Sequence, residues 1–256
     1  IAIFLRTARA AILSSAFDAA RYYLETVMDI ALAHHKQDKS FLLHLYGEYH
    51  LVLFSLSLFQ QMDEVFETLT GISSDPVDLV DIYCTQLISL SNRSRHEEAF
   101  YLGTSMLEKL GVFYPEENLA AAVENVVEKC SSAIHDSPPT VLQTSNLLEN
   151  QRDLAAAKLL NRISPAALFF KPLASIWAIS VNTNLLMEKG ISSWGLESAA
   201  AFILGMISFK NDYLPGYKLT QDTLLITRKM GFSYELYRIC HIFGLMVVHW
   251  FEPLEN

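Results

Sequence analysis

Histidines and carboxylates come first in a search for chemistry, because they supply most metal ligands and most general acids and bases. His44 and Glu48 are four residues apart and would share one face of a helix, whereas His50 points elsewhere. A zinc site needs three or four converging ligands. The adjacent pairs His34-His35 and Cys240-His241 cannot supply them, because neighbouring residues do not share a helix face. We therefore expect no metal site.

Sequence motifs for catalysis are missing. The chain contains no phosphate-binding G-x-x-x-x-G-K-[ST] or G-x-G-x-x-G loop, no G-x-S-x-G nucleophile turn and no H-E-x-x-H zinc motif. Acidic pairs such as Glu97-Glu98 and Glu116-Glu117 stand at expected helix starts, where they interact favourably with the helix dipole. We expect no catalytic residue and no cofactor.

Charge and cysteine content restrict the partners and the compartment. A net charge of −9 without a run of basic residues argues against nucleic acid and anionic membranes. Residues 199–207 form too short an apolar stretch to cross a bilayer, which takes about 20 residues. Cys84, Cys130 and Cys240 are far apart, which favours reduced thiols. We expect a cytoplasmic chain with no nucleic-acid partner and no membrane insertion. Since it begins within a helical pattern and lacks a signal peptide, we also expect a fragment of a longer protein.

Helical periodicity runs through nearly the whole chain, and glycine and proline mark the boundaries. Ser94 and Glu97 have capping-box spacing and predict a helix that ends at Gly111, where a left-handed cap favours glycine. Residues 41–59 predict one helix, and 116–134 a linking helix before a loop at Ser131–Ser137 and Pro138-Pro139. Further predicted starts are Asp75-Pro76 and Ser164-Pro165, and further predicted stops are Gly71, Gly190 and Gly231.

Four short segments share a helix-start pattern in which an aromatic or bulky residue is followed by polar residues and then, three or four places on, by a small or aromatic residue. They are Phe17–Ala20, Met62–Val65, His96–Ala99 and Tyr213–Gly216. The second and third lie 34 residues apart, the tetratricopeptide period, and the first and second 45 apart. We predict an all-α, tetratricopeptide-like, right-handed solenoid of antiparallel helix pairs with roughly twelve helices. The predicted domains are repeats over 1–113, a linking helix and loop over 114–150, and continuing repeats over 151–256.

Aromatic residues are the best candidates for a binding surface. Charged residues make up 18% of the chain, below the roughly 25% of typical soluble proteins, so either much of the surface is buried between helices or part of it contacts a partner. Most aromatics should pack between helices, and some could line the concave groove of a solenoid, since tyrosine and tryptophan are good interface anchors. The candidate groove residues are Tyr46, Tyr49, Trp177, Trp194 and Tyr217.

Residues 194–253 carry a family resemblance. They contain Glu197-Ser198-Ala199 at a helix start, the motif Tyr213-x-x-Gly216-Tyr217, and the ending His249-Trp250-x-x-Pro253. Upstream, residues 99–115 read AFYLGTSMLEKLGVFYP. The stretch resembles the helical-repeat region of large signalling proteins in which an ATPase precedes the repeats and a GAF domain and a sensor histidine kinase follow, often with an N-terminal serine/threonine-kinase-like domain. The residues that mark structure rather than a site are Ser94, Glu97, Gly111, Gly216, His249 and Trp250.

This resemblance implies a non-catalytic regulatory module that couples a partner or a signal to flanking ATPase and kinase domains. The Walker motifs and the phospho-accepting histidine box are absent, so neither activity is assigned to this chain. Two alternatives stay open: a stand-alone tetratricopeptide adaptor that binds a peptide in its concave groove, and a helical small-molecule-binding or enzymatic domain. The expected partner is protein, either flanking domains of the same chain or a peptide, and a homodimer is compatible with each alternative.

Overall fold

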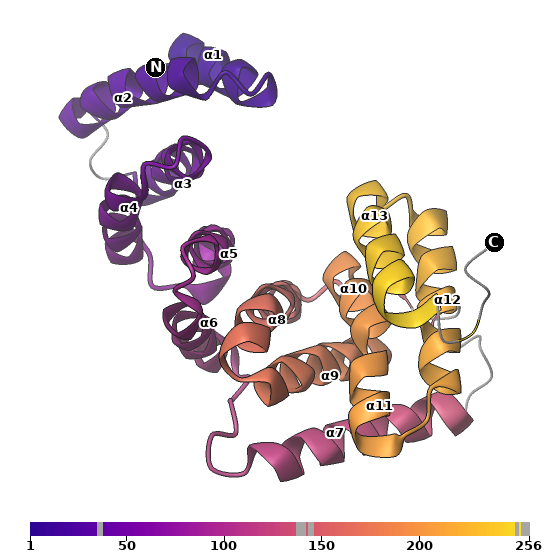
Figure 1. Cartoon of the computed structure of the whole chain (residues 1–256). Helices are drawn as coiled ribbons and strands as arrows, with labels where there is room; N and C mark the ends of the chain where they lie inside the picture. The colour runs from indigo at the N-terminus through magenta and orange to yellow at the C-terminus, as the bar shows by residue number, and fades with distance from the viewer. Residues whose placement is uncertain (35–37, 137–141, 143–145, 249–250, 252–256) are drawn as a thin grey trace. The chain divides into compact units, whose positions relative to one another are not determined.

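The computed structural model describes residues 1–34, 38–136, 142, 146–248 and 251, and this part of the chain is all-helical (Figure 1). The helices run from α1 to α13, followed by a short π-helical segment, η1. The predicted all-α class is confirmed. The described residues form thirteen α-helices, close to the twelve expected. Two of them, α10 and α11, are separated by Phe202 alone.

The chain divides into two compact units, Ile1–Ser94 and Arg95–Asn256. This division differs from the predicted boundaries after residues 113 and 150. Helix α6 (His96–Leu110) was expected among the N-terminal repeats but belongs to the second unit, because it packs on α8 (Gln151–Phe170). The predicted linking segment, residues 114–150, lies within the second unit.

The first unit contains five helices that contact one another in chain order. They are α1 (Ala2–Leu13), α2 (Phe17–His34), α3 (Lys39–Ser55), α4 (Phe59–Ile72) and α5 (Pro76–Asn92). Helix α3 also packs on α5. Leucine side chains fill the core between them, among them the buried Leu24, Leu53 and Leu69. The predicted start at Asp75-Pro76 is confirmed, since the Asp75 side chain accepts a hydrogen bond from the Val77 amide and proline opens α5.

One turn recurs before helices α2, α4 and α6. Ser15, Ser57 and Ser94 each adopt a left-handed conformation, with φ of 59°, 58° and 58°, and in each case the next helix begins two residues later. In the second of these turns the Ser57 amide donates to the Phe54 carbonyl at 3.0 Å, and the next amide reaches back five residues. These bonds close the end of the preceding helix as a Schellman motif does.

The recurring turn corrects two sequence predictions. The helix predicted over 41–59 ends at Ser55, because Ser57 leaves the helical conformation. Ser94 is not an N-cap: its backbone closes the end of α5, and α6 follows Arg95 without a side-chain cap, leaving Glu97 exposed in its first turn. The left-handed cap predicted at Gly111 is confirmed, with φ of 91°.

The spacing of the repeat also changes. Met62 lies three residues inside α4, so the segment equivalent to Phe17–Ala20 and His96–Ala99 begins at Phe59. Helix starts at residues 17, 59 and 96 are separated by neither 45 nor 34 residues. In the corrected register the fourth position of each helix is Ala20, Met62 or Ala99, and all three side chains are fully buried. The pattern thus marks the residue that contacts the neighbouring helix.

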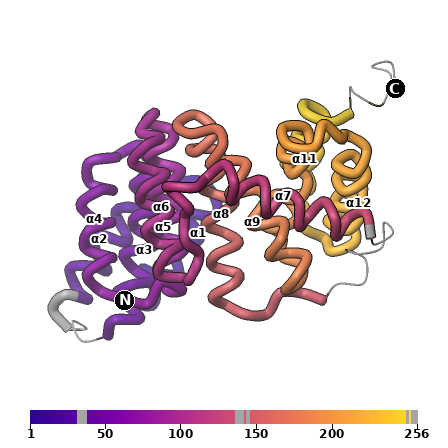
Figure 2. The backbone as a smooth tube through the Cα atoms, turned by 90° about the horizontal axis from the view of Figure 1, so that it is seen from below, coloured from indigo at the N-terminus to yellow at the C-terminus, as the bar shows by residue number. Residues whose placement is uncertain are grey.

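The second unit contains α6, α7 (Leu119–Asp136), α8, α9 (Pro172–Lys189), α10 (Ser193–Ala201), α11 (Ile203–Lys210), α12 (Leu214–Met230), α13 (Ser233–Ile242) and η1 (Phe243–Val247). Helix α9 contacts α7, α8 and α10, so it occupies the centre of this unit, as Figure 2 shows from below. Helix α10 packs on α12 and α13. At the contact of α11 with α12, a Cβ atom on Gly216 would lie 2.8 Å from Ile203 Cγ1, so glycine permits close approach there.

Other predicted boundaries in and around the second unit have mixed outcomes. Gly231 ends α12 in a left-handed conformation and Gly190 caps α9, as predicted, whereas Gly71 lies within α4. Pro165 does not start a helix but lies inside α8, where the buried Ala166 and Ala167 continue the packing beyond it. Residues 131–136 belong to α7 and not to a loop. Pro138-Pro139, His249 and Trp250 lie outside the described residues.

In the part of the chain that the structure describes, every helix is too short or too polar to span a bilayer.

Candidate functional site

Two predicted groove residues, Tyr46 and Tyr49, lie on α3 in the first unit. Tyr46 is half-buried. Tyr49 is buried, and its hydroxyl donates a hydrogen bond of 2.8 Å to Glu25, which also pairs with Arg21 at 2.7 Å. Burial, helped by the Glu25 carboxylate, raises the pKa of Tyr49 to about 12. Tyr49 is therefore a core residue that joins α3 to α2.

The other three predicted groove residues lie in the second unit, on three different helices. Trp177 on α9 is 3% exposed and packs its ring edge against Tyr114, so it is a core residue. Trp194 on α10 is half-exposed and has both Lys158 and Arg162 over its ring, at 5.1 and 4.9 Å from the centroid. Tyr217 on α12 stacks on Phe251 and Phe243. Each residue has its own set of neighbours.

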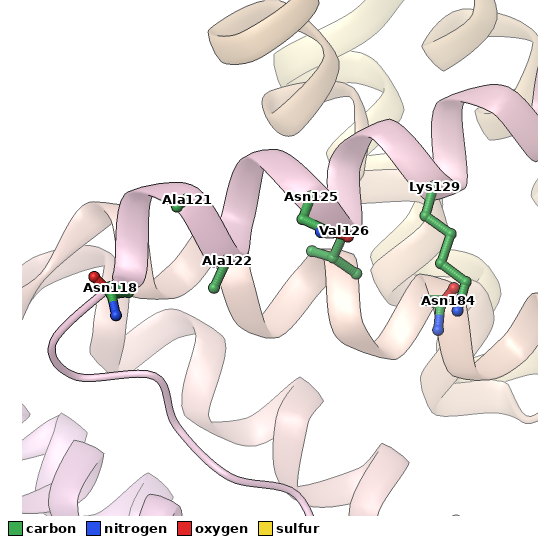
Figure 3. A pocket seen from close by; sticks show the side chains of 7 residues that line it. All are labelled: Asn118, Ala121, Ala122, Asn125, Val126, Lys129 and Asn184. Carbon is green, nitrogen blue, oxygen red and sulfur yellow. The ribbon is translucent and has the colours of Figure 1, made fainter.

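A groove in the second unit follows α7 beside α9, with a volume of about 540 Å³ (Figure 3). Asn118, Ala121, Ala122, Asn125, Val126, Lys129 and Asn184 line it. All but Asn184 come from α7 or the residue before it, and Asn184 comes from α9. Three side-chain amides therefore line the groove together with Ala121, Ala122, Val126 and the charged Lys129.

The amphipathic pattern of α7 explains why these side chains face outward. Lining positions recur at intervals of three or four residues, which places them on one side of the helix. The opposite side carries Val123, Val127 and Cys130, which are at most 1% exposed and pack into the unit. Burial raises the pKa of the Cys130 thiol to about 12, so this cysteine is an unreactive core residue.

Charge at one end of the groove is neutralised within the protein. Lys129 Nζ lies 2.5 Å from Glu188 Oε1, and the other oxygen of that carboxylate accepts a hydrogen bond of 3.1 Å from the Asn184 amide. The hydrogen bond to Glu188 raises the pKa of Lys129, which keeps the ammonium charged. The groove therefore offers mainly hydrogen-bonding amides, each with donor and acceptor atoms.

A buried polar cluster forms the second notable feature of this unit. Glu197 on α10 is 5% exposed, and Arg238 on α13 contacts its carboxylate at 2.6 Å. Nearby, the Asn182 amide donates to Ser198 Oγ at 2.8 Å and to the Ala157 carbonyl at 3.0 Å. Burial raises the pKa of Glu197, and the Arg238 charge acts against this shift. The cluster joins α8, α9, α10 and α13, which is a structural role.

The sequence contained no sign of this cluster. In the sequence Glu197 appeared only as part of a helix-start motif. Its partner Arg238 lies on α13, three helices further along the chain. A charged residue on an apolar helix such as α10 is a weak signal, because it equally fits a solvent-exposed position. The pairing depends on the contact of α10 with α13, which only the tertiary structure supplies.

Packing also determines the environment of His50. His50 is 1% exposed, and its Nε2 lies 3.0 Å from Gln86 Oε1. Gln86 in turn donates to Asp63 at 2.6 Å, and Arg93 holds the same carboxylate with two bonds of 2.7 and 2.8 Å. This network joins α3, α4 and α5. Among the residues that the structure describes, no three His, Cys, Asp or Glu side chains gather as a metal site requires.

Comparison with known proteins gives no match among protein-family models, curated proteins or solved structures.

Proposed function

We propose that this chain is a non-catalytic interaction module that binds an extended polypeptide segment along the α7–α9 groove. The observation that carries the proposal is the lining of that groove by Asn118, Asn125 and Asn184. A side-chain amide can donate to a backbone carbonyl and accept from a backbone amide at once, so a row of amides suits an extended main chain. Ala121 and Ala122 leave room for that main chain to approach α7.

We further propose a tetratricopeptide-like, right-handed solenoid of antiparallel helix pairs as the architecture behind this function. Its support is the turn that recurs at Ser15, Ser57 and Ser94 and the buried fourth position of each following helix. The contact of α3 with α5 is of the kind that joins the first helices of successive pairs in such arrays.

The cellular role that we propose is regulation within a cytoplasmic, multidomain signalling protein. It rests on the resemblance of residues 194–253 to the repeat region of signalling ATPase and histidine-kinase proteins. In that setting the bound segment belongs to a flanking domain, and its release or capture couples a signal to the ATPase or kinase. Hydrogen exchange of α7 tests this role, because the flanking segment would protect α7 in the longer protein and not in this chain alone.

A stand-alone peptide adaptor is the second candidate, and the same groove favours it. The test is enrichment of a displayed library of random 15-residue peptides on the purified chain. We expect selected peptides to lose about tenfold or more in affinity when Asn125→Ala or Asn184→Ala removes one of these side-chain amides. Gln151→Ala is the matched control, since it removes an exposed amide outside the groove. Selected peptides that bind these variants and the unaltered chain equally would exclude the groove as the binding site.

A further inference from the structure

The strongest unexplained feature outside the groove is the environment of Lys171, the residue between α8 and α9. Its Nζ lies 5.5 Å from the ring centroid of Phe170, 5.8 Å from that of Tyr101 and 5.9 Å from that of Tyr114. Glu116 Oε1 is 3.9 Å from the same nitrogen. One ammonium group is thus shared by three aromatic rings and a carboxylate.

The rings form walls that do not depend on the lysine. Tyr101 and Phe170 meet at 67° with their centroids 5.7 Å apart, so they form two sides of a corner. Tyr114 packs edge-on against Phe100 and Trp177, which are 0% and 3% exposed. Because these residues belong to the core, Tyr114 is held in place from behind, and removal of the lysine side chain would leave the walls standing.

The mouth of this arrangement is accessible. The Lys171 side chain keeps 36% of its surface exposed, and Tyr101 is 41% exposed. Phe113 and Phe169 nearby in the chain are 72% and 74% exposed, which is unusual for large apolar side chains. A ligand can therefore reach the rings from solvent, and the lysine can leave them for water at small cost.

We propose that Tyr101, Tyr114 and Phe170 form an aromatic cage for a methylated ammonium group, and that Lys171 is an internal occupant that such a ligand displaces. Ring faces attract cations, and methylation weakens the hydration that a cation must lose on entry, so a methylated ammonium binds more tightly than the lysine. The Glu116 carboxylate adds a charge contact at the edge. None of these residues lines the α7–α9 groove.

The experiment is calorimetric titration of the chain with tetramethylammonium, choline and a peptide that contains trimethyllysine. Lys171→Ala is expected to bind at least one of these probes about tenfold more tightly than the unaltered chain, because the competing internal cation is gone. Adding Tyr114→Ala to that variant should abolish the gain. Circular dichroism of each variant checks that the helices remain. An unmethylated lysine peptide serves as the ligand control.

The outcomes separate cleanly. If Lys171→Ala binds both small cations more tightly than the unaltered chain, the methylated ammonium group alone is sufficient for binding. If it binds only the trimethyllysine peptide more tightly, a methylated protein is the source of the ligand. Both results support the cage. The proposal is overturned if folded Lys171→Ala binds no probe more tightly than the unaltered chain. It is equally overturned if the gain survives in a folded Lys171→Ala/Tyr114→Ala variant.

Discussion

In the first unit each helix contacts the next along the chain, whereas in the second unit α6 packs on α8 and α7 packs on α9. One buried polar group from each unit follows the same division. The network of His50, Gln86 and Asp63 joins helices that are close in sequence, but Glu197 and Arg238 come from helices separated by two others. Packing between helices that are neighbours in the chain gives a periodic pattern in the sequence. Packing between helices that are not neighbours gives little such pattern.

The largest effect that would sharpen this comparison is expected at Gly216. Gly216→Val places side-chain atoms against the α11 backbone, since its Cβ would lie 3.1 Å from Ile203 Cα. We expect the free energy of unfolding of the second unit to fall by about 3 kcal/mol. Tryptophan fluorescence during urea unfolding measures it, because all three tryptophans belong to that unit. Gly71→Ala in the first unit is the control and is followed by circular dichroism: no atom lies near its Cβ position, and a small gain in stability is expected.

Removing Arg238 is the next largest change. Arg238→Ala leaves the buried Glu197 carboxylate without its cation and should cost the second unit about 2 kcal/mol, a value reduced because the arginine is partly exposed. Glu197→Gln in the same chain should recover much of that loss, since it removes the uncompensated charge. Equal stability of Arg238→Ala and the unaltered chain would show that the pair makes no net contribution.

The two units should respond to pH in opposite directions. Burial lowers the pKa of His50 from 6.5, so its contribution to the first unit is present above pH 6.5 and lost as pH falls. Burial raises the pKa of Glu197 from 4.5, so its contribution to the second unit is present below pH 4.5 and lost as pH rises through the raised value. Circular dichroism follows both units, and tryptophan fluorescence follows the second. His50→Gln and Glu197→Gln should each flatten one of the two profiles.

The smallest predicted effect compares the turns. Ser57 in the first unit and Gly231 in the second are both left-handed, with φ of 58° and 73°, and the following helix begins two residues later in each case. Ser57→Gly should stabilise the first unit, and Gly231→Ser destabilise the second, each by about 1 kcal/mol. Thermal unfolding followed by circular dichroism provides the measurement. Shifts of the same sign in both variants would show that the two turns are not equivalent.

The candidate site was only partly predictable. Sequence reasoning selected aromatic residues for a groove, but Tyr49 and Trp177 are core residues, and five of the seven residues that line the α7–α9 groove are asparagine or alanine. Asparagines on the outer face of an amphipathic helix carry no distinctive signal, because most such residues are simply solvated. The aromatic cage was missed for a similar reason, since Tyr101, Tyr114 and Lys171 meet only when α8 packs on α6.

The sequence by itself determined the all-helical class, the caps at Gly111 and Gly231 and the start at Asp75-Pro76, because these depend on local periodicity and backbone preference. Only the tertiary structure decided that Ser94 closes a helix and that Pro165 lies within one. It also paired Glu197 with Arg238. Around Pro165 and at the pair of Glu197 and Arg238, burial and long-range contacts outweighed a local preference, and such contacts join residues whose separation in the chain carries no period.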